Sequence, residues 1–101
     1  MKIMTVSELK QHLNNKDVCL VDVREPDEYA QMSIQGAYLI PLDQVCCEAL
    51  PTTTKPLVIH CRSGKRSAMA CERLLTERPD LEVYSLEGGI LAWHAAGYDV
   101  C

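Results

Sequence analysis

PLVIHCRSGKRS, residues 56–67, places a cysteine between a strand pattern and a basic loop. Leu57–Ile59 is a short apolar run with two β-branched residues, which is typical of a strand buried on both faces. Cys61 follows, then Arg62-Ser63-Gly64-Lys65-Arg66, and Ser67 opens a helical pattern. Open α/β sheets bind ligands at this kind of position, where a strand ends and a helix begins. The segment therefore predicts a site at the end of a central strand.

The surroundings of Cys61 are those of a nucleophile. Amide groups of the loop and of the first helical turn have no intrahelical partners, so they can point at an anion, and the helix dipole adds ~0.5 of a positive charge. Arg62, Lys65 and Arg66 add three formal positive charges. Positive surroundings favour the thiolate, the reactive form of cysteine. Gly64 suits a loop that folds closely around one atom. The alternative is a buried structural cysteine followed by a solvated basic turn.

Composition indicates a single globular domain spanning residues 1–101. The chain is 48% hydrophobic and 24% charged, which is typical of a folded protein with one core. Its net charge of −4 argues against nucleic acid as a partner. No apolar run approaches the ~18 residues of a membrane span, and residues 1–10 lack the apolar core of a signal peptide. We expect the protein in the cytoplasm, with no membrane partner.

The six cysteines do not form a disulfide or metal pattern. There is no C-x-x-C motif, and the three histidines lack zinc-ligand spacing with the cysteines. We therefore expect free thiols in a reducing compartment, and neither a metal nor a cofactor. A functional role stays open for three of them, Cys46, Cys47 and Cys101, because an exposed thiol could accept sulfur or form intermolecular bonds.

Strand and helix patterns alternate along the chain with short connections, which predicts an α/β fold. The central sheet should be mainly parallel, with helices on both faces. The predicted strands are Lys2–Met4, Val18–Val23, Ala37–Ile40, Leu57–Ile59 and Val83–Leu86. Five helices are predicted. One follows the capping box of Thr5 and Glu8, one begins at Pro26, one spans residues 44–50 with Asp43 as its cap, one begins at Ser67, and one contains Trp93. No helix or strand is predicted for residues 98–101.

Three segments resemble the rhodanese family of thiosulfate and persulfide sulfurtransferases. They are VDVREPDEYAQMSIQGAYLIPL at residues 21–42, HCRSGKRS at 60–67 and LEGGILAW at 86–93. The likeness covers essentially the whole chain, and the segment around Cys61 is the most specific. One departure is Met32-Ser33-Ile34, where the family usually has Gly-His-Ile. We expect that change to alter local structure and not activity.

The resemblance implies a reaction and a set of roles. Cys61 would take the outer sulfur of thiosulfate or of a persulfide donor and hold it as a persulfide, cradled by residues 62–67. Cyanide, a small thiol or a protein cysteine would then remove the sulfur. Arg62, Lys65 and Arg66 would attract the anionic donor. The resemblance also implies that Asp22 and Arg24 support the site, although a structural salt bridge is the simpler interpretation.

Other residues near these motifs have simpler roles. His60 is adjacent to Cys61, but consecutive strand residues face opposite sides of a sheet, so His60 should not reach the thiol as a base. Trp93 is expected in the core. Gly88-Gly89 is interpreted as a tight turn, with a place on the site rim as the alternative.

Two rival functions stay open at this stage. The first is a cysteine-dependent phosphatase or arsenate reductase, since related domains hold an oxyanion between a cysteine and an arginine. Those phosphatases have five residues between the two, whereas Cys61 and Arg66 have four between them. The second is a non-catalytic docking module of the same fold. Such modules commonly lack the cysteine that this chain retains.

Overall fold

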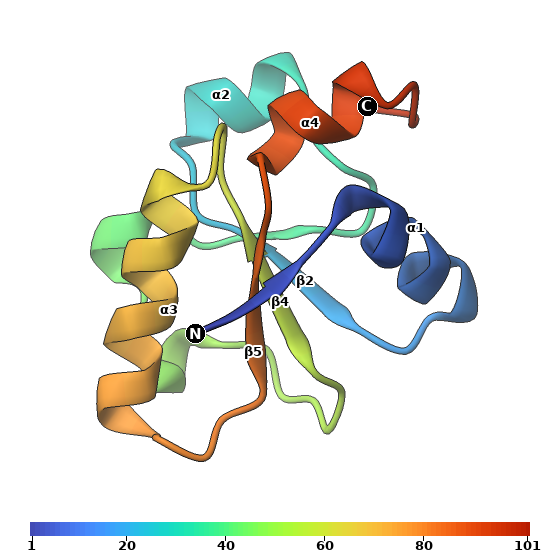
Figure 1. The fold of residues 1–101 in the computed structure, drawn as a ribbon. Helices are drawn as coiled ribbons and strands as arrows, with labels where there is room; N and C mark the ends of the chain where they lie inside the picture. The colour runs from blue at the N-terminus through green and yellow to red at the C-terminus, as the bar shows by residue number, and fades with distance from the viewer.

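Five parallel strands form one sheet in the order β1-β5-β4-β2-β3 in the computed structural model, which describes residues 1–101 (Figure 1). The elements in chain order are β1 (Lys2–Met4), α1 (Val6–Asn15), β2 (Cys19–Asp22), α2 (Pro26–Gln31), β3 (Tyr38–Leu39), the 3₁₀ turns η1 (Leu42–Gln44) and η2 (Cys47–Ala49), β4 (Leu57–His60), α3 (Lys65–Glu77), β5 (Val83–Leu86) and α4 (Gly89–Ala95). The sequence-based prediction of an α/β fold with a parallel sheet is confirmed.

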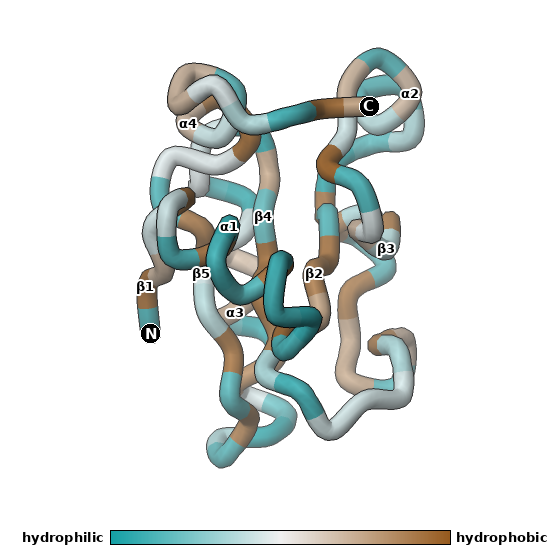
Figure 2. The backbone as a smooth tube through the Cα atoms, turned by 90° about the vertical axis from the view of Figure 1, so that its right-hand side faces the viewer, coloured by the Kyte–Doolittle hydropathy of each residue, from teal (hydrophilic) through white to brown (hydrophobic).

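The central strands β2 and β4 are the most apolar part of the sheet. All four residues of each strand are buried, and Val21 lies opposite Ile59 in the register between them. A strand covered on both faces needs apolar side chains at successive positions, which explains why their sequences are continuous runs and do not alternate. Figure 2 shows the hydrophobic colouring along β2.

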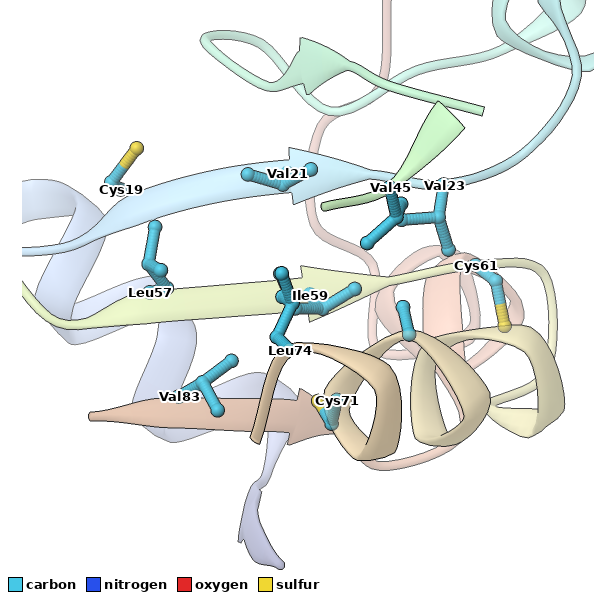
Figure 3. Packing of buried hydrophobic residues seen from close by; sticks show 11 residues of the cluster. Cys19, Val21, Val23, Val45, Leu57, Ile59, Cys61, Cys71, Leu74 and Val83 are labelled. Carbon is cyan, nitrogen blue, oxygen red and sulfur yellow. The ribbon is translucent and has the colours of Figure 1, made fainter. Parts of the chain in front are cut away.

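Two hydrophobic layers cover the two faces of this sheet. α3 lies on one side and α1 on the other in Figure 1. One layer consists of Cys19, Val21, Val23, Val45, Leu57, Ile59, Cys61, Ala70, Cys71, Leu74 and Val83 (Figure 3). The other consists of Met4, Leu9, Val18, Leu20, Ile34, Ala37, Val58, Leu86, Ile90 and Trp93. Trp93 is buried, as predicted, and helices do cover both faces.

Helix α3 begins two residues earlier than the sequence pattern indicated. Its first residue is Lys65, and Gly64 is the N-cap with a φ of +113°. Glycine reaches this region of positive φ without the strain that a Cβ would cause. The loop between β4 and α3 is therefore only Cys61–Gly64, and Ser67 lies within the first helical turn.

The predicted helix over residues 44–50 is wrong. Two short 3₁₀ turns replace it, separated at Cys46 by extended backbone with a φ of −158°. Asp43 does not cap a helix here, because η1 has no side-chain cap. Contacts with α3 hold these turns: the Cys47 amide donates to Glu77 Oε1 at 3.0 Å, and the Arg73 guanidinium donates to the Leu42 carbonyl at 2.6 Å. Tertiary packing has overridden a helical apolar spacing.

The remaining elements lie close to their predicted places. The capping box of Thr5 and Glu8 is formed in both directions at the start of α1. β3 is shorter than predicted, with only two residues. The C-terminal tail packs on α4, where the Trp93 indole donates to the Asp99 carbonyl at 2.9 Å. None of the helices has both the length and the apolar character that crossing a membrane requires.

Candidate active site

The thiol of Cys61 lies where β4 ends and α3 begins. Its Sγ accepts hydrogen bonds from the Gly64 amide at 3.1 Å and from the Ser67 amide at 3.3 Å. Only 1% of Cys61 is exposed, and Figure 3 shows its sulfur directed toward the first turn of α3. The helix dipole and two amide donors therefore act on this one sulfur atom, and both favour negative charge there.

Backbone contacts from α4 hold the loop in this shape. The Ile90 amide donates to the Cys61 carbonyl at 2.9 Å, and the Leu91 amide donates to the Arg62 carbonyl at 3.1 Å. Gly89, at the start of α4, has a φ of +59° and lies so close that a Cβ would come within 2.5 Å of the Cys61 carbonyl oxygen. The Gly88-Gly89 pair thus brings two helix amides against the loop, which the sequence did not predict.

Two buried hydroxyls brace the loop from below. Ser67 Oγ donates to the Gly64 carbonyl at 2.9 Å, and it lies 2.7 Å from Ser85 Oγ on β5. Because the single Ser67 hydroxyl proton goes to Gly64, Ser85 is the donor in the second bond. Ser85 was not recognised in the sequence, since a serine in a strand pattern gives no sign of what it faces.

The basic side chains of the loop differ in their partners. Arg62 and Lys65 are exposed and make no salt bridge, and Ser63 between them in the loop is also exposed. Arg66 binds Glu28 of α2 with both terminal nitrogens: Nη1 lies 2.6 Å from Oε1 and Nη2 lies 2.9 Å from Oε2. This hydrogen-bonded pairing lowers the pKa of Glu28 to about 2. The carboxylate of Glu28 is thus part of the site that sequence patterns missed.

Asp22 and Arg24 form a buried ion pair at the same edge of the sheet. Arg24 Nη2 lies 2.8 Å from Asp22 Oδ2, and Arg24 Nε contacts the same carboxylate. Arg24 Nη2 also donates to the Met32 carbonyl at 2.6 Å, which fixes the end of α2. The structural salt bridge predicted for these two residues is therefore present, and it supports the helix that carries Glu28.

His60 lies beneath the site and does not contact the thiol. Its Nδ1 is 3.3 Å from the Cys61 carbonyl oxygen, and its Nε2 is 3.5 Å from Asp22 Oδ2. A neutral imidazole carries one N–H, so it can donate to only one of these two acceptors. Burial nevertheless lowers the pKa of His60, with the Asp22 charge opposing that effect. The folded protein therefore holds a neutral ring here.

We expect His60 to make the protein less stable in mild acid. The unfolded chain binds a proton on this ring at a higher pH than the folded chain does, so stability present above pH 6.5 is lost as the pH falls below it. The loss can reach about 1.4 kcal/mol per pH unit. The free energy of unfolding in urea at pH 7.5 and 5.5 should differ less for His60→Asn than for the unchanged protein. His94→Asn, at an exposed position, is the control; an equal pH difference in His60→Asn would contradict the prediction.

The other cysteines are less suited to nucleophilic chemistry. All six thiols are free. Burial raises the pKa of Cys71 to about 11, and it also raises the pKa of Cys19 and Cys47. Cys61 alone combines amide donors to sulfur with the start of a helix.

Comparison with known proteins gives the class of this chain. The rhodanese-like domain model matches residues 5–96. A sulfurtransferase of Allochromatium vinosum is 38% identical over 95 residues, covering 91% of this chain and 87% of that protein. The thiosulfate sulfurtransferase GlpE of Shewanella oneidensis is 32% identical over 96 residues, covering 94% of each. The protein therefore belongs to the rhodanese-like domain family, whose members include sulfurtransferases.

Solved structures agree with this assignment. A rhodanese-like domain protein from Staphylococcus aureus superposes with a TM-score of 0.77 at 36% identity, covering 92% of this chain and 91% of that one. Some relatives are longer: this chain spans only 49% of an uncharacterized Synechocystis protein, to which it is 40% identical over 89 residues. The small rhodanese-like domain is what all these proteins share with the chain.

Proposed function

We propose that this protein is a sulfurtransferase that carries a sulfane sulfur on Cys61. The observation that carries the proposal is the pair of backbone amides on Sγ, from Gly64 and Ser67, at the first turn of α3. Such a cradle stabilises a sulfur anion at rest and a persulfide anion after transfer. The sulfurtransferase names of two relatives support the same conclusion.

The proposed first half-reaction transfers one sulfur to the enzyme. The Cys61 thiolate attacks the outer sulfur of thiosulfate, the S–S bond of the donor breaks, and sulfite leaves with the bonding electron pair. A persulfide donor, R–S–SH, reacts in the same way and releases R–S⁻. In both cases Cys61 becomes a persulfide, and no oxidant or reductant is consumed. Arg62 and Lys65, exposed and without ion-pair partners, would attract an anionic donor.

The proposed second half-reaction returns the thiolate. Cyanide, a small thiol or a protein cysteine attacks the outer sulfur of the persulfide, and Cys61 leaves as a thiolate held again by the loop amides. The donor in the cell would be thiosulfate or a persulfide delivered by another protein. The six free thiols fit a reducing compartment, so we place this cycle in the cytoplasm.

The geometry favours this chemistry over that of a phosphatase. Four residues separate Cys61 from Arg66. Both terminal nitrogens of Arg66 bind Glu28, so this arginine is not free to hold a phosphate above the thiol. A docking module without activity would not need amide donors on sulfur.

Initial-rate kinetics test the proposed cycle. Thiosulfate and cyanide should give thiocyanate with ping-pong kinetics, because the donor product leaves before the acceptor binds. Double-reciprocal plots against thiosulfate, at several cyanide concentrations, should therefore be parallel lines. Intersecting lines would show that both substrates bind together and would overturn the covalent cycle. An absence of thiocyanate with thiosulfate and with a persulfide donor would favour a docking module.

A further inference from the structure

Glu28 places a fixed negative charge beside the loop that holds Cys61. Its carboxylate accepts from both terminal nitrogens of Arg66, and Oε1 also accepts from the Glu25 amide at 3.0 Å. The Glu28 and Arg66 side chains are 25% and 31% exposed, so the pair faces solvent and is not sealed in the core. An anion approaching the loop meets a neutral pair at this position and not a free guanidinium.

The supporting contacts show that this carboxylate is held in place. Arg24 contacts the Met32 carbonyl at 2.6 Å and the Glu28 carbonyl at 3.4 Å, and Asp22 fixes Arg24 in turn. The helix that carries Glu28 is therefore anchored to the sheet edge from which Cys61 emerges. Because Arg66 lowers the pKa of Glu28 to about 2, the carboxylate is ionised at any physiological pH.

We infer that Glu28 is a specificity-determining residue, which makes the site favour persulfide donors over the dianion thiosulfate. This inference rests on the proposed sulfur transfer. Thiosulfate brings two negative charges to the loop, whereas an alkyl persulfide is attacked in its protonated form R–S–SH, which carries no charge at its reacting end. Coulomb energy scales with the product of the charges, so cancelling the positive charge of Arg66 weakens the binding of the dianion most. Because Glu28 neutralises Arg66, only Arg62 and Lys65 remain as unpaired positive charges that attract the dianion.

The test compares how fast Cys61 is loaded by two donors. Single-turnover loading from thiosulfate and from cysteine persulfide is followed by intact mass at pH 7 for the unchanged protein and for Glu28→Gln. The glutamine keeps an oxygen that can accept from Arg66 and from the Glu25 amide but carries no charge. The ratio of the thiosulfate rate constant to the persulfide rate constant should rise about tenfold.

Asp27→Asn is the matched control, because it removes one exposed carboxylate from the same helix. Its donor ratio should stay within about twofold of the unchanged protein, since screening by water and salt weakens a distant surface charge. A double variant, Glu28→Gln with Arg66→Gln, removes both charges of the pair and should bring the ratio back toward that of the unchanged protein. Thermal unfolding of each variant shows whether the fold is retained.

The outcomes separate this inference from the proposed function. If both donors load Cys61 but Glu28→Gln changes both rate constants by the same factor, or neither, the sulfur-transfer function stands and the role of Glu28 is overturned. An equal rise of the ratio in Asp27→Asn also overturns it, because net charge alone would then explain the effect. If neither donor loads the unchanged protein, the proposed function itself fails.

Discussion

Replacing Cys61 with serine should lower the rate of thiocyanate formation by at least about a thousandfold. The loss of a covalent nucleophile removes the whole reaction path, which is a larger effect than the loss of a single contact. A serine hydroxyl can accept the same hydrogen bonds from Gly64 and Ser67, so the loop should keep its shape. The measurement is kcat/KM for thiosulfate with cyanide as acceptor, together with the thermal unfolding midpoint.

Two other cysteines provide the controls for this variant. Cys101 is exposed and Cys46 is partly buried, and neither lies in the loop. Cys101→Ser and Cys46→Ser should therefore keep the kcat/KM of the unchanged protein. If Cys61→Ser retained activity while one of these variants lost it, the nucleophile would be that cysteine.

Replacing Gly89 with alanine should cost both activity and stability. The new Cβ would lie within 2.5 Å of the Cys61 carbonyl oxygen and closer still to that of Arg62, both rigid backbone atoms. α4 would have to move away, which would break the bonds from the Ile90 and Leu91 amides to the loop. We expect a loss of more than about 2 kcal/mol in the free energy of unfolding. Because the cradle around Cys61 would also shift, kcat/KM should fall by about a hundredfold or more.

Gly97→Ala is the matched control for this substitution. Gly97 also has a positive φ, of +84°, but a Cβ there would meet nothing within 4 Å. It should cost only the strain of positive φ, about 1 kcal/mol, and leave kcat/KM unchanged. Equal losses in Gly89→Ala and Gly97→Ala would show that backbone strain alone matters and that α4 does not hold the loop.

Local patterns were enough to predict the strands and the loop. The apolar run before Cys61, the glycine after it and the capping box at Thr5 each depend on neighbours in sequence, and each appears in the structure. The segment 44–50 was misassigned because its spacing fits a helix, while a hydrogen bond from the Cys47 amide to Glu77 of α3 holds it in turns. A partner so distant in the chain leaves no local periodicity.

The same reason explains which parts of the site were missed. Glu28 lies in a helix 38 residues before Arg66, and the pair exists only because α2 lies beside the loop in the folded protein. The role of Gly89 likewise depends on how closely α4 approaches β4. At the unusual Met32-Ser33-Ile34 segment, the amide and carbonyl of Ser33 pair with those of Cys101. Its effect on activity stays a prediction.

Intact mass after donor treatment tests the central claim most directly. The purified protein is treated with thiosulfate or with a persulfide donor, then with cyanide, alongside Cys61→Ser. We predict a gain of one sulfur, about 32 Da, which appears only when Cys61 is present and disappears with cyanide. A gain from the persulfide donor alone would keep the Cys61 cycle and change the donor. No gain from either donor, or the same gain in Cys61→Ser, would contradict sulfur transfer through Cys61.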